Sequence, residues 1–302
     1  MTSAGTLSPR AILVHRRSEY DELVARHGTA RQVEFFLAQR GRSLAEVRRR
    51  HELQDEALHT VAAVLPATWR RGEVERADLS RFAFAPEDVV LVVGQDGLVA
   101  NVAKYLDGQP VVGFDPEPDR NPGVLVPHSP DAAGAAILRA VRGSCVELTM
   151  VEATSDSGES LRALNEVYIG QPGHQSARYE LRLDTELGER SELQSSSGLL
   201  VGTGTGATGW LRSAWQERHS PLALPRRDEP SLAWFVREAW PSPATGTSLT
   251  EGVVARGGSL DVVSASDRLV CFGDGIEADA LSVAWGQRLS VTVSDTRLRL
   301  VV

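Results

Sequence analysis

Residues 88–106 read DVVLVVGQDGLVANVAKYL, and this stretch decides the fold. The run from Asp88 to Val93 is apolar after its first residue, too short for a helix and typical of a strand buried on both faces. The turn GQDG at 94–97 ends it, and Leu98 to Leu106 is compatible with a helix. The stretch therefore predicts a strand, a tight loop and a helix.

Two further apolar runs flank this unit, Arg10 to His15 and Pro110 to Phe114, and each predicts a buried strand. After the second, a Pro-rich loop from Asp115 to Pro130 leads to a helix expected over about Asp131 to Val141. Strands that alternate with helices imply a parallel sheet. We expect an α/β nucleotide-binding domain over residues 1–142.

Helices are also expected between the first two strands. Thr29 with Gln32, and Ser43 with Glu46, have the spacing of capping boxes at helix starts. Apolar residues on one face of the following segments support amphipathic helices up to Pro66. We expect a helical N-terminal layer.

The pattern of apolar and polar residues changes from Cys145 onward. Short alternating runs such as YELRL at 179–183 are separated by Gly, Asp, Ser and Pro, and one helix is expected over about Thr208 to Glu217. We expect a β-rich domain over residues 143–302, whose last residues could pack back on the first domain.

Composition excludes several classes of function. The chain has 302 residues, 42% of them hydrophobic, and a formal charge of −8, so no positive field would attract nucleic acid. No stretch approaches the roughly 20 apolar residues of a membrane span, and Met1 to Arg10 lacks a signal core, so we expect a cytoplasmic protein. Cys145 and Cys271 have no metal-ligand spacing and are expected to be buried apolar residues. Lys104 is the only lysine beside 31 arginines, which indicates a GC-rich bacterial source.

The first candidate site is the GQDG turn at 94–97. It follows a predicted parallel strand, where open α/β sheets bind ligands, and glycines there allow a phosphate to approach the backbone. Asp96 is its only carboxylate and could accept a proton from a hydroxyl or hold a metal. The alternative is a helix N-cap.

The second candidate is the pair Asn165-Glu166. Asn offers a donor and an acceptor, and Glu can accept from both hydroxyls of a ribose, so the pair suits a nucleoside. The alternative is an ordinary turn before a strand.

The third candidate is the glycine-rich loop in SGLLVGTGTGATGW at 197–210, which joins an apolar strand to a helix. It could present several N–H groups and hydroxyls to an anion, although it lacks the Gly-Lys-Ser/Thr ending of a Walker loop. The alternative is a glycine-rich hairpin corner. Elsewhere, His51 and His59 are expected to be solvated surface residues, and Asp274-Gly275 is expected to be a hairpin turn.

These loops, in this order, resemble the motifs of the NAD kinase family, and the resemblance is closest to its mitochondrial type. The corresponding strings are GQDG at 94–97, ALNEVYIG at 163–170 and SSGLLVGTGTGATGW at 196–210. The similarity extends to 29–51 and 110–125, so most of the chain is covered. The family implies an α/β N-terminal domain with a parallel sheet plus a β-rich C-terminal domain, as in NAD kinases and diacylglycerol kinases.

The resemblance implies transfer of the γ-phosphoryl group of ATP to the 2′-hydroxyl of the NAD adenosine ribose, with Mg2+ and in a homodimer. Asp96 would be the general base or metal-orienting carboxylate, and no other residue is assigned to the metal. Gly94, Gln95 and Gly97 would form the phosphate turn. The NAD-binding residues would be Asn165, Glu166, Thr203, Thr205, Gly206 and Thr208.

Three positions depart from the family pattern. Gln95 replaces a glycine, Leu98 stands where a small polar residue is usual, and Ala207 replaces a serine. Each change removes close backbone approach or a hydroxyl near phosphates. Two alternatives to an active NAD kinase therefore stay open: a kinase of the same fold acting on a lipid or nucleoside hydroxyl, and a catalytically weak dinucleotide-binding regulator.

Overall fold

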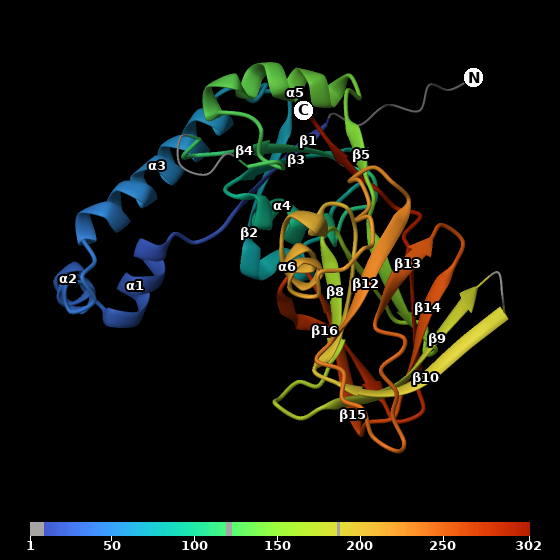
Figure 1. Cartoon of the computed structure of the whole chain (residues 1–302). Coiled ribbons are helices and arrows are strands. Elements are labelled where there is room, and N and C mark those ends of the chain that lie inside the picture. The colour runs from blue at the N-terminus through green and yellow to red at the C-terminus, as the bar shows by residue number, and fades with distance from the viewer. Residues whose placement is uncertain (1–8, 119–122, 186–187) are drawn as a thin grey trace, which may run out of the picture. The chain divides into compact units, whose positions relative to one another are not determined.

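A computed structural model describes residues 9–118, 123–185 and 188–302 (Figure 1). The chain forms two compact units. The first consists of Met1–Val102, Gly108–Val146 and Arg299–Val302, and the second of Ala103–Asp107 and Glu147–Leu298. The chain therefore passes from one unit to the other more than once.

The first unit is built on a six-stranded sheet of order β2-β1-β3-β4-β18-β5. The pairs β1/β2, β1/β3, β3/β4 and β4/β18 are parallel. Its strands are β1 (Arg10–His15), β2 (Arg70–Glu75), β3 (Asp88–Val93), β4 (Pro110–Phe114), β5 (Val146–Leu148) and β18 (Leu298–Leu300). Every residue of β3 is buried, as expected for a central strand of a parallel sheet.

Helices cover both faces of this sheet. The helices are α1 (Glu19–His27), α2 (Ala30–Ala38), α3 (Leu44–Ala63), α4 (Asp96–Ala103) and α5 (Ala133–Val141), with short 3₁₀ segments η1 (Arg76–Arg81) and η2 (Pro130–Ala132). Val61 of α3 and Ile137 of α5 pack with Leu91 and Val112 on one face, while α4 lies on the other (Figure 1). The helices α1, α2 and the start of α3 share a separate small core around Leu37.

The second unit contains two six-stranded sheets, β10-β9-β14-β17-β6-β7 and β13-β12-β11-β8-β15-β16, in which the neighbouring strands are antiparallel. One continuous core lies between them and includes Tyr179, Leu181, Ile169 and Trp234. The strands are β6 (Val151–Ser155), β7 (Ser160–Ala163), β8 (Glu166–Gly170), β9 (Ala177–Thr185), β10 (Gly188–Ser196), β11 (Gly198–Gly202), β12 (Ser231–Arg237), β13 (Glu251–Ala255), β14 (Ser259–Ser264), β15 (Arg268–Gly273), β16 (Ile276–Ala284) and β17 (Arg288–Val293).

A 3₁₀ turn η3 (Gly206–Thr208) and the helix α6 (Trp210–Glu217) follow β11. They pack on the outer face of the second sheet, where Leu211 of α6 contacts the cluster that includes Leu200 and Phe235. The glycine-rich loop thus leads directly from the buried strand β11 into the helix α6, which packs on the outer face of the sheet that contains β11.

The structure confirms the expected fold class, an α/β unit with a parallel sheet and a β-rich unit. The strands predicted at 10–15, 88–93 and 110–114 have the expected bounds. Helix α1 was not expected, although Ser18 and Asp21 form a complete capping box at its start. Its polar sequence, with one buried residue, Leu23, hides the periodicity that would predict it.

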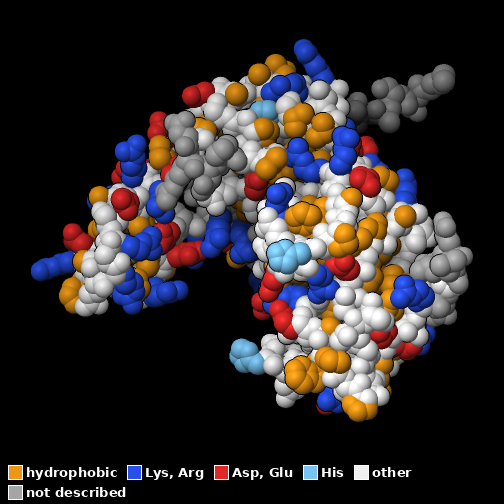
Figure 2. All heavy atoms as spheres, viewed as in Figure 1, with side chains coloured by type: hydrophobic (Ala, Val, Ile, Leu, Met, Phe, Trp, Pro, Cys, Tyr) orange, Lys and Arg blue, Asp and Glu red, His pale blue; other side chains and the backbone are white. Residues whose placement is uncertain are grey.

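Figure 2 shows acidic and basic side chains intermixed over the helices α1 to α3 rather than separated into patches of one sign. Across the described ranges 9–118, 123–185 and 188–302, no helix is both long and apolar enough to cross a membrane.

Candidate active site

The GQDG turn of the first unit links β3 to α4, and Asp96 is the first residue of that helix. Its carboxylate accepts two backbone N–H bonds, from Val124 to Oδ2 at 2.9 Å and from Leu125 to Oδ1 at 2.9 Å. A Cβ atom added to Gly123 would lie 2.4 Å from Oδ1. Asp96 therefore ties the turn to the loop that follows β4, and each oxygen keeps acceptor capacity because a carboxylate oxygen has two lone pairs.

The two glycines of this turn have different surroundings. A Cβ on Gly94 would lie 3.0 Å from Leu98 Cδ2, whereas a Cβ on Gly97 would meet nothing within 4 Å. Leu98 is buried, with 6% of its surface exposed. The Leu98 side chain therefore contributes to packing beside the turn. Gln95 is exposed and is not among the described non-glycine residues with positive φ.

Sequence reasoning missed a second carboxylate close to this turn. Asp115 directly follows β4, is 6% exposed, and accepts the N–H of Glu117 at 2.8 Å. Burial raises its pKa, and the charges of Glu117 and Asp96 act in the same direction. Its position directly after β4 could have indicated it from the sequence, because the carboxyl ends of neighbouring parallel strands such as β3 and β4 meet at the same edge of a sheet.

The pair Asn165-Glu166 of the second unit stands where β8 begins. The Asp274 carboxylate accepts the backbone N–H of Leu164 at 2.7 Å, of Asn165 at 2.8 Å and of Glu166 at 3.3 Å. Asp274 and Gly275 form the expected two-residue hairpin turn between β15 and β16, with φ of 52° and 69°. The turn does more than reverse the chain, since its carboxylate holds the pair.

Two carboxyl groups of this cluster have raised pKa values. Burial raises the pKa of Glu166 to about 7, and the charge of Asp274 contributes. Burial also raises the pKa of Asp274 to about 6, although three N–H bonds and Lys104 oppose the increase. Perturbed carboxyl groups of this kind cluster at functional sites.

The glycine-rich loop lies against the pair. Thr203 donates its hydroxyl to the carbonyl oxygen of Leu164 at 2.6 Å, and its N–H to that of Asn165 at 2.8 Å. A Cβ on Gly206 would lie 2.3 Å from the Asn165 carbonyl oxygen and 3.0 Å from Glu166 Oε2. The structure thus brings Asn165, Glu166, Thr203 and Gly206 together within one unit.

Thr205 supplies the one threonine hydroxyl in this loop that is buried without a hydrogen-bond partner among the described residues. Its carbonyl accepts the hydroxyl of Thr208 at 2.9 Å, and its N–H donates to the hydroxyl oxygen of Thr203 at 3.0 Å. A buried unsatisfied hydroxyl is costly, so a ligand atom is a natural partner for it.

The expectation for His51 was wrong. Its side chain is 23% exposed, contacts Ser18 Oγ through Nδ1 at 2.9 Å, and lies 3.6 Å from Asp21 and 3.4 Å from Asp55. Ser18 caps α1 and Asp21 belongs to it, and this helix was not predicted from the sequence, whereas Asp55 lies on α3 together with His51. Of the two cysteines, Cys271 is buried as expected, whereas Cys145 is only partly buried.

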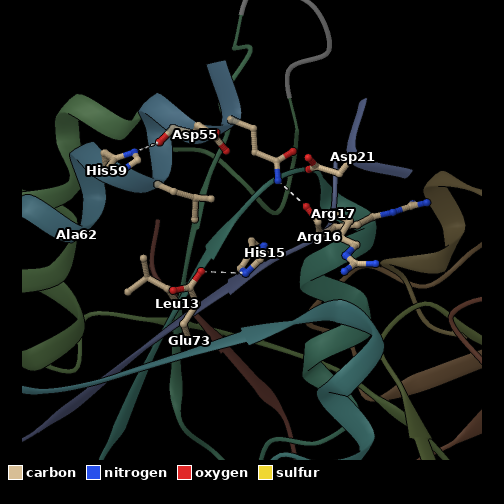
Figure 3. Close-up of a pocket in the computed structure, with 11 residues that line it drawn as sticks. Leu13, His15, Arg16, Arg17, Asp21, Asp55, His59, Ala62 and Glu73 are labelled. Atoms are coloured by element: carbon tan, nitrogen blue, oxygen red, sulfur yellow. Dashed lines mark hydrogen bonds and ion pairs between the residues drawn. The ribbon is translucent and has the colours of Figure 1, made fainter. Parts of the chain in front are cut away.

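A separate pocket of about 330 Å³ lies in the first unit, between β1, β2 and α3 (Figure 3). His15 and Glu73 both line it and contact each other, with Nε2 and Oε1 3.0 Å apart, and His59 Nδ1 contacts the carbonyl oxygen of Asp55. No residue of the three candidate loops lines this pocket. Among the residues that the structure describes, no group of three or more His, Cys, Asp or Glu side chains could hold a metal ion.

The chain is similar to known NAD kinases in sequence and in fold. Over 145 residues, 46% of this chain, the sequence is 32% identical to the NAD kinase of Chlorobaculum tepidum, and the match spans 47% of that protein, about half its length. The fold is similar to that in a crystal structure of an NAD kinase from Archaeoglobus fulgidus in complex with ATP, with a TM-score of 0.58 and 16% identity, over 97% of this chain and 93% of that one. No protein-family model matches the sequence.

Proposed function

We infer that this chain belongs to the NAD kinase family, and we propose that it transfers the γ-phosphoryl group of ATP to the 2′-hydroxyl of the NAD adenosine ribose. The observation that carries the proposal is the Asn165-Glu166 pair, held by Asp274 beside the buried free hydroxyl of Thr205. The sequence relative and the fold likeness to NAD kinases support it. Its mitochondrial subtype stays a prediction.

Asn165 and Glu166 are proposed to hold the adenosine of NAD. The ionised Glu166 carboxylate accepts from ribose hydroxyls, and the Asn165 amide both donates and accepts. The loop residues Thr203, Thr205, Gly206 and Thr208 line the same dinucleotide site, and Thr205 gives its hydroxyl to a ligand oxygen. Gly206 is required because a side chain there would strike the Asn165 carbonyl.

Asp96 is proposed as the general base that takes the proton of the attacking hydroxyl, or as the carboxylate that orients the metal. In the phosphate turn of Gly94, Gln95 and Gly97, the N–H of Gly94 already donates to the Phe114 carbonyl oxygen at 3.0 Å, so the start of α4 would be the part of the turn that faces phosphate. Phosphoryl transfer needs mainly alignment and charge neutralisation, so this small set of groups is sufficient.

The metal proposed is Mg2+ bound with ATP. Mg2+ in such sites is held by one or two carboxylates together with substrate phosphates, and the described residues offer no cage of three or more ligands. The free acceptor capacity of Asp96 fits this arrangement. The ion supplies charge neutralisation on the transferred phosphoryl group.

A coupled assay tests the proposal: purified protein is incubated with NAD, ATP and Mg2+, and NADP is measured with an NADP-specific dehydrogenase. NADP formation that requires ATP is expected. Phosphorylation of a lipid or a nucleoside in place of NAD would favour a kinase of the same fold that acts on another hydroxyl substrate. NAD binding without turnover would favour a dinucleotide-binding regulator. We also propose, from the family resemblance, that the protein is a cytoplasmic homodimer. Sedimentation of the purified protein measures its oligomeric state.

A further inference from the structure

Lys104 is the only lysine of the chain, whereas the other 31 Lys or Arg positions are arginine. Its side chain is 2% exposed, and its ammonium donates to Asp279 Oδ1 at 2.8 Å and to the carbonyl oxygen of Gly273 at 3.2 Å. An ammonium is compact, with three donors on one nitrogen, while a guanidinium is a larger planar fork. A buried position that needs two partners from one nitrogen therefore suits lysine, even in a chain that otherwise uses arginine.

The partner of this ammonium is itself held in place. Tyr105 donates its hydroxyl to Asp279 Oδ2 at 2.5 Å, so both oxygens of the Asp279 carboxylate are engaged. Residues 103–107 and 147–298 belong to the same compact unit, and this ion pair lies within it. Such a buried pair fixes its surroundings, because separating the two charges leaves one of them unpaired away from water.

The second acceptor of Lys104 connects the ion pair to the proposed NAD site. Gly273 precedes the Asp274-Gly275 turn, whose two residues both have positive φ. The Asp274 carboxylate receives the N–H groups of Leu164, Asn165 and Glu166, and its own N–H donates to the Glu166 carbonyl oxygen at 3.1 Å. Hydrogen bonds thus link Asp279 to Lys104 and Lys104 to Gly273, the peptide bond joins Gly273 to Asp274, and hydrogen bonds link Asp274 to the pair.

We infer that Lys104 is a positioning residue: by binding the Gly273 carbonyl it holds the Asp274-Gly275 turn in place, and the turn holds the backbone of Asn165-Glu166 in the orientation that nucleoside recognition needs. The positive charge of Lys104 also opposes the increase that burial causes in the pKa of Asp274. It thereby favours the carboxylate, the form that accepts all three N–H bonds. The inference rests on the proposed function only for the identity of the ligand.

The test compares Lys104→Met with a matched control, Arg256→Met, which removes the cation of an exposed ion pair with Asp295 in the same unit. Hydrogen exchange measured by mass spectrometry should be at least tenfold faster in peptides covering 160–170 of Lys104→Met. Peptides from β14 should exchange as in the parent chain. Steady-state kinetics should give a KM for NAD raised at least tenfold with kcat changed less than threefold, because the loss is in substrate binding. The control should change neither.

Each other result has a definite meaning. Unchanged exchange at 160–170, or faster exchange that includes β14 to the same degree, would overturn the positioning role. Faster local exchange with an unchanged KM for NAD would keep that role and overturn Asn165-Glu166 as the NAD site. If Lys104→Met does not fold, Asp274→Asn replaces it, since the isosteric amide leaves the Lys104–Asp279 pair intact. It should speed exchange at 160–170 alone, and unchanged exchange there would equally overturn the inference.

Discussion

The side chain of Asp96 accepts the N–H groups of Val124 and Leu125, and its oxygens keep acceptor capacity that the proposed general base would use for a substrate hydroxyl. We expect Asp96→Asn to lower kcat at least about a hundredfold and to leave the affinity for NAD nearly unchanged, because a general base acts in the transition state. Steady-state kinetics and calorimetry with NAD measure both quantities. A variant that keeps most of its kcat would remove Asp96 from the mechanism.

Gln95 stands where the motif of NAD kinases, which the GQDG turn resembles, has a glycine. Its exposed side chain and the absence of positive φ indicate that the backbone is not strained there. We therefore expect Gln95→Gly to leave kcat with ATP unchanged or to reduce it. Steady-state kinetics of this variant measure kcat with ATP, and a rise of tenfold or more would show that Gln95 obstructs catalysis.

Glu166 should make NAD binding depend on pH. Its pKa is raised to about 7, so the carboxylate that we propose accepts from ribose hydroxyls is lost as the pH falls below that value. The KM for NAD should therefore rise between pH 8 and pH 6 while the KM for ATP changes less. Glu166→Gln should abolish this dependence and weaken NAD binding by roughly 1.5–3 kcal/mol per charged hydrogen bond lost. Equal weakening of NAD and ATP binding would place Glu166 outside the NAD site.

At the scale of elements, the approach of the glycine-rich loop to β8 gives a paired test. A Cβ on Gly206 would lie 2.3 Å from the Asn165 carbonyl oxygen, whereas on Gly209 the nearest atom would be 3.9 Å away. Gly206→Ala should therefore raise the KM for NAD at least about tenfold, which corresponds to a loss of about 1.4 kcal/mol in binding free energy. Gly209→Ala is the control and should change it little. The same KM for both variants would contradict the proposed contact.

The elements that sequence predicts well are those whose pattern depends on burial alone. The strands β3 and β4 are short apolar runs bounded by turn residues, so their ends could be assigned from sequence. Helix α1 was missed because its nine residues bury only Leu23. The loops of the candidate site were located by their glycines and carboxylates. The Asp274 carboxylate was not linked to Asn165 because they are 109 positions apart, and only the pairing of β15 with β8 brings them together.

At the scale of the whole molecule, the first unit depends on residues that follow the second unit in sequence. Leu300 of β18 is 1% exposed, and the carbonyl oxygen of Val301 contacts His128 Nε2 at 3.1 Å. We expect Leu300→Ala to reduce the free energy of unfolding of the first unit by about 2–5 kcal/mol. Denaturant unfolding measures this, with Val302→Ala, at a residue 51% exposed, as a control that should stay within about 0.5 kcal/mol. Equal stability of both variants would contradict a structural role for β18.

The place of β18 between β4 and β5 also has a consequence for synthesis on the ribosome. The edge of β4 that β18 occupies stays unpaired until residues 147–298 of the second unit have been translated, which takes roughly eight to thirty seconds at typical elongation rates. An open strand edge is a template for pairing with other chains. The speed of translation through the second unit therefore sets how long the nascent first sheet is exposed to misassembly, and the yield of folded protein in a cell should depend on it.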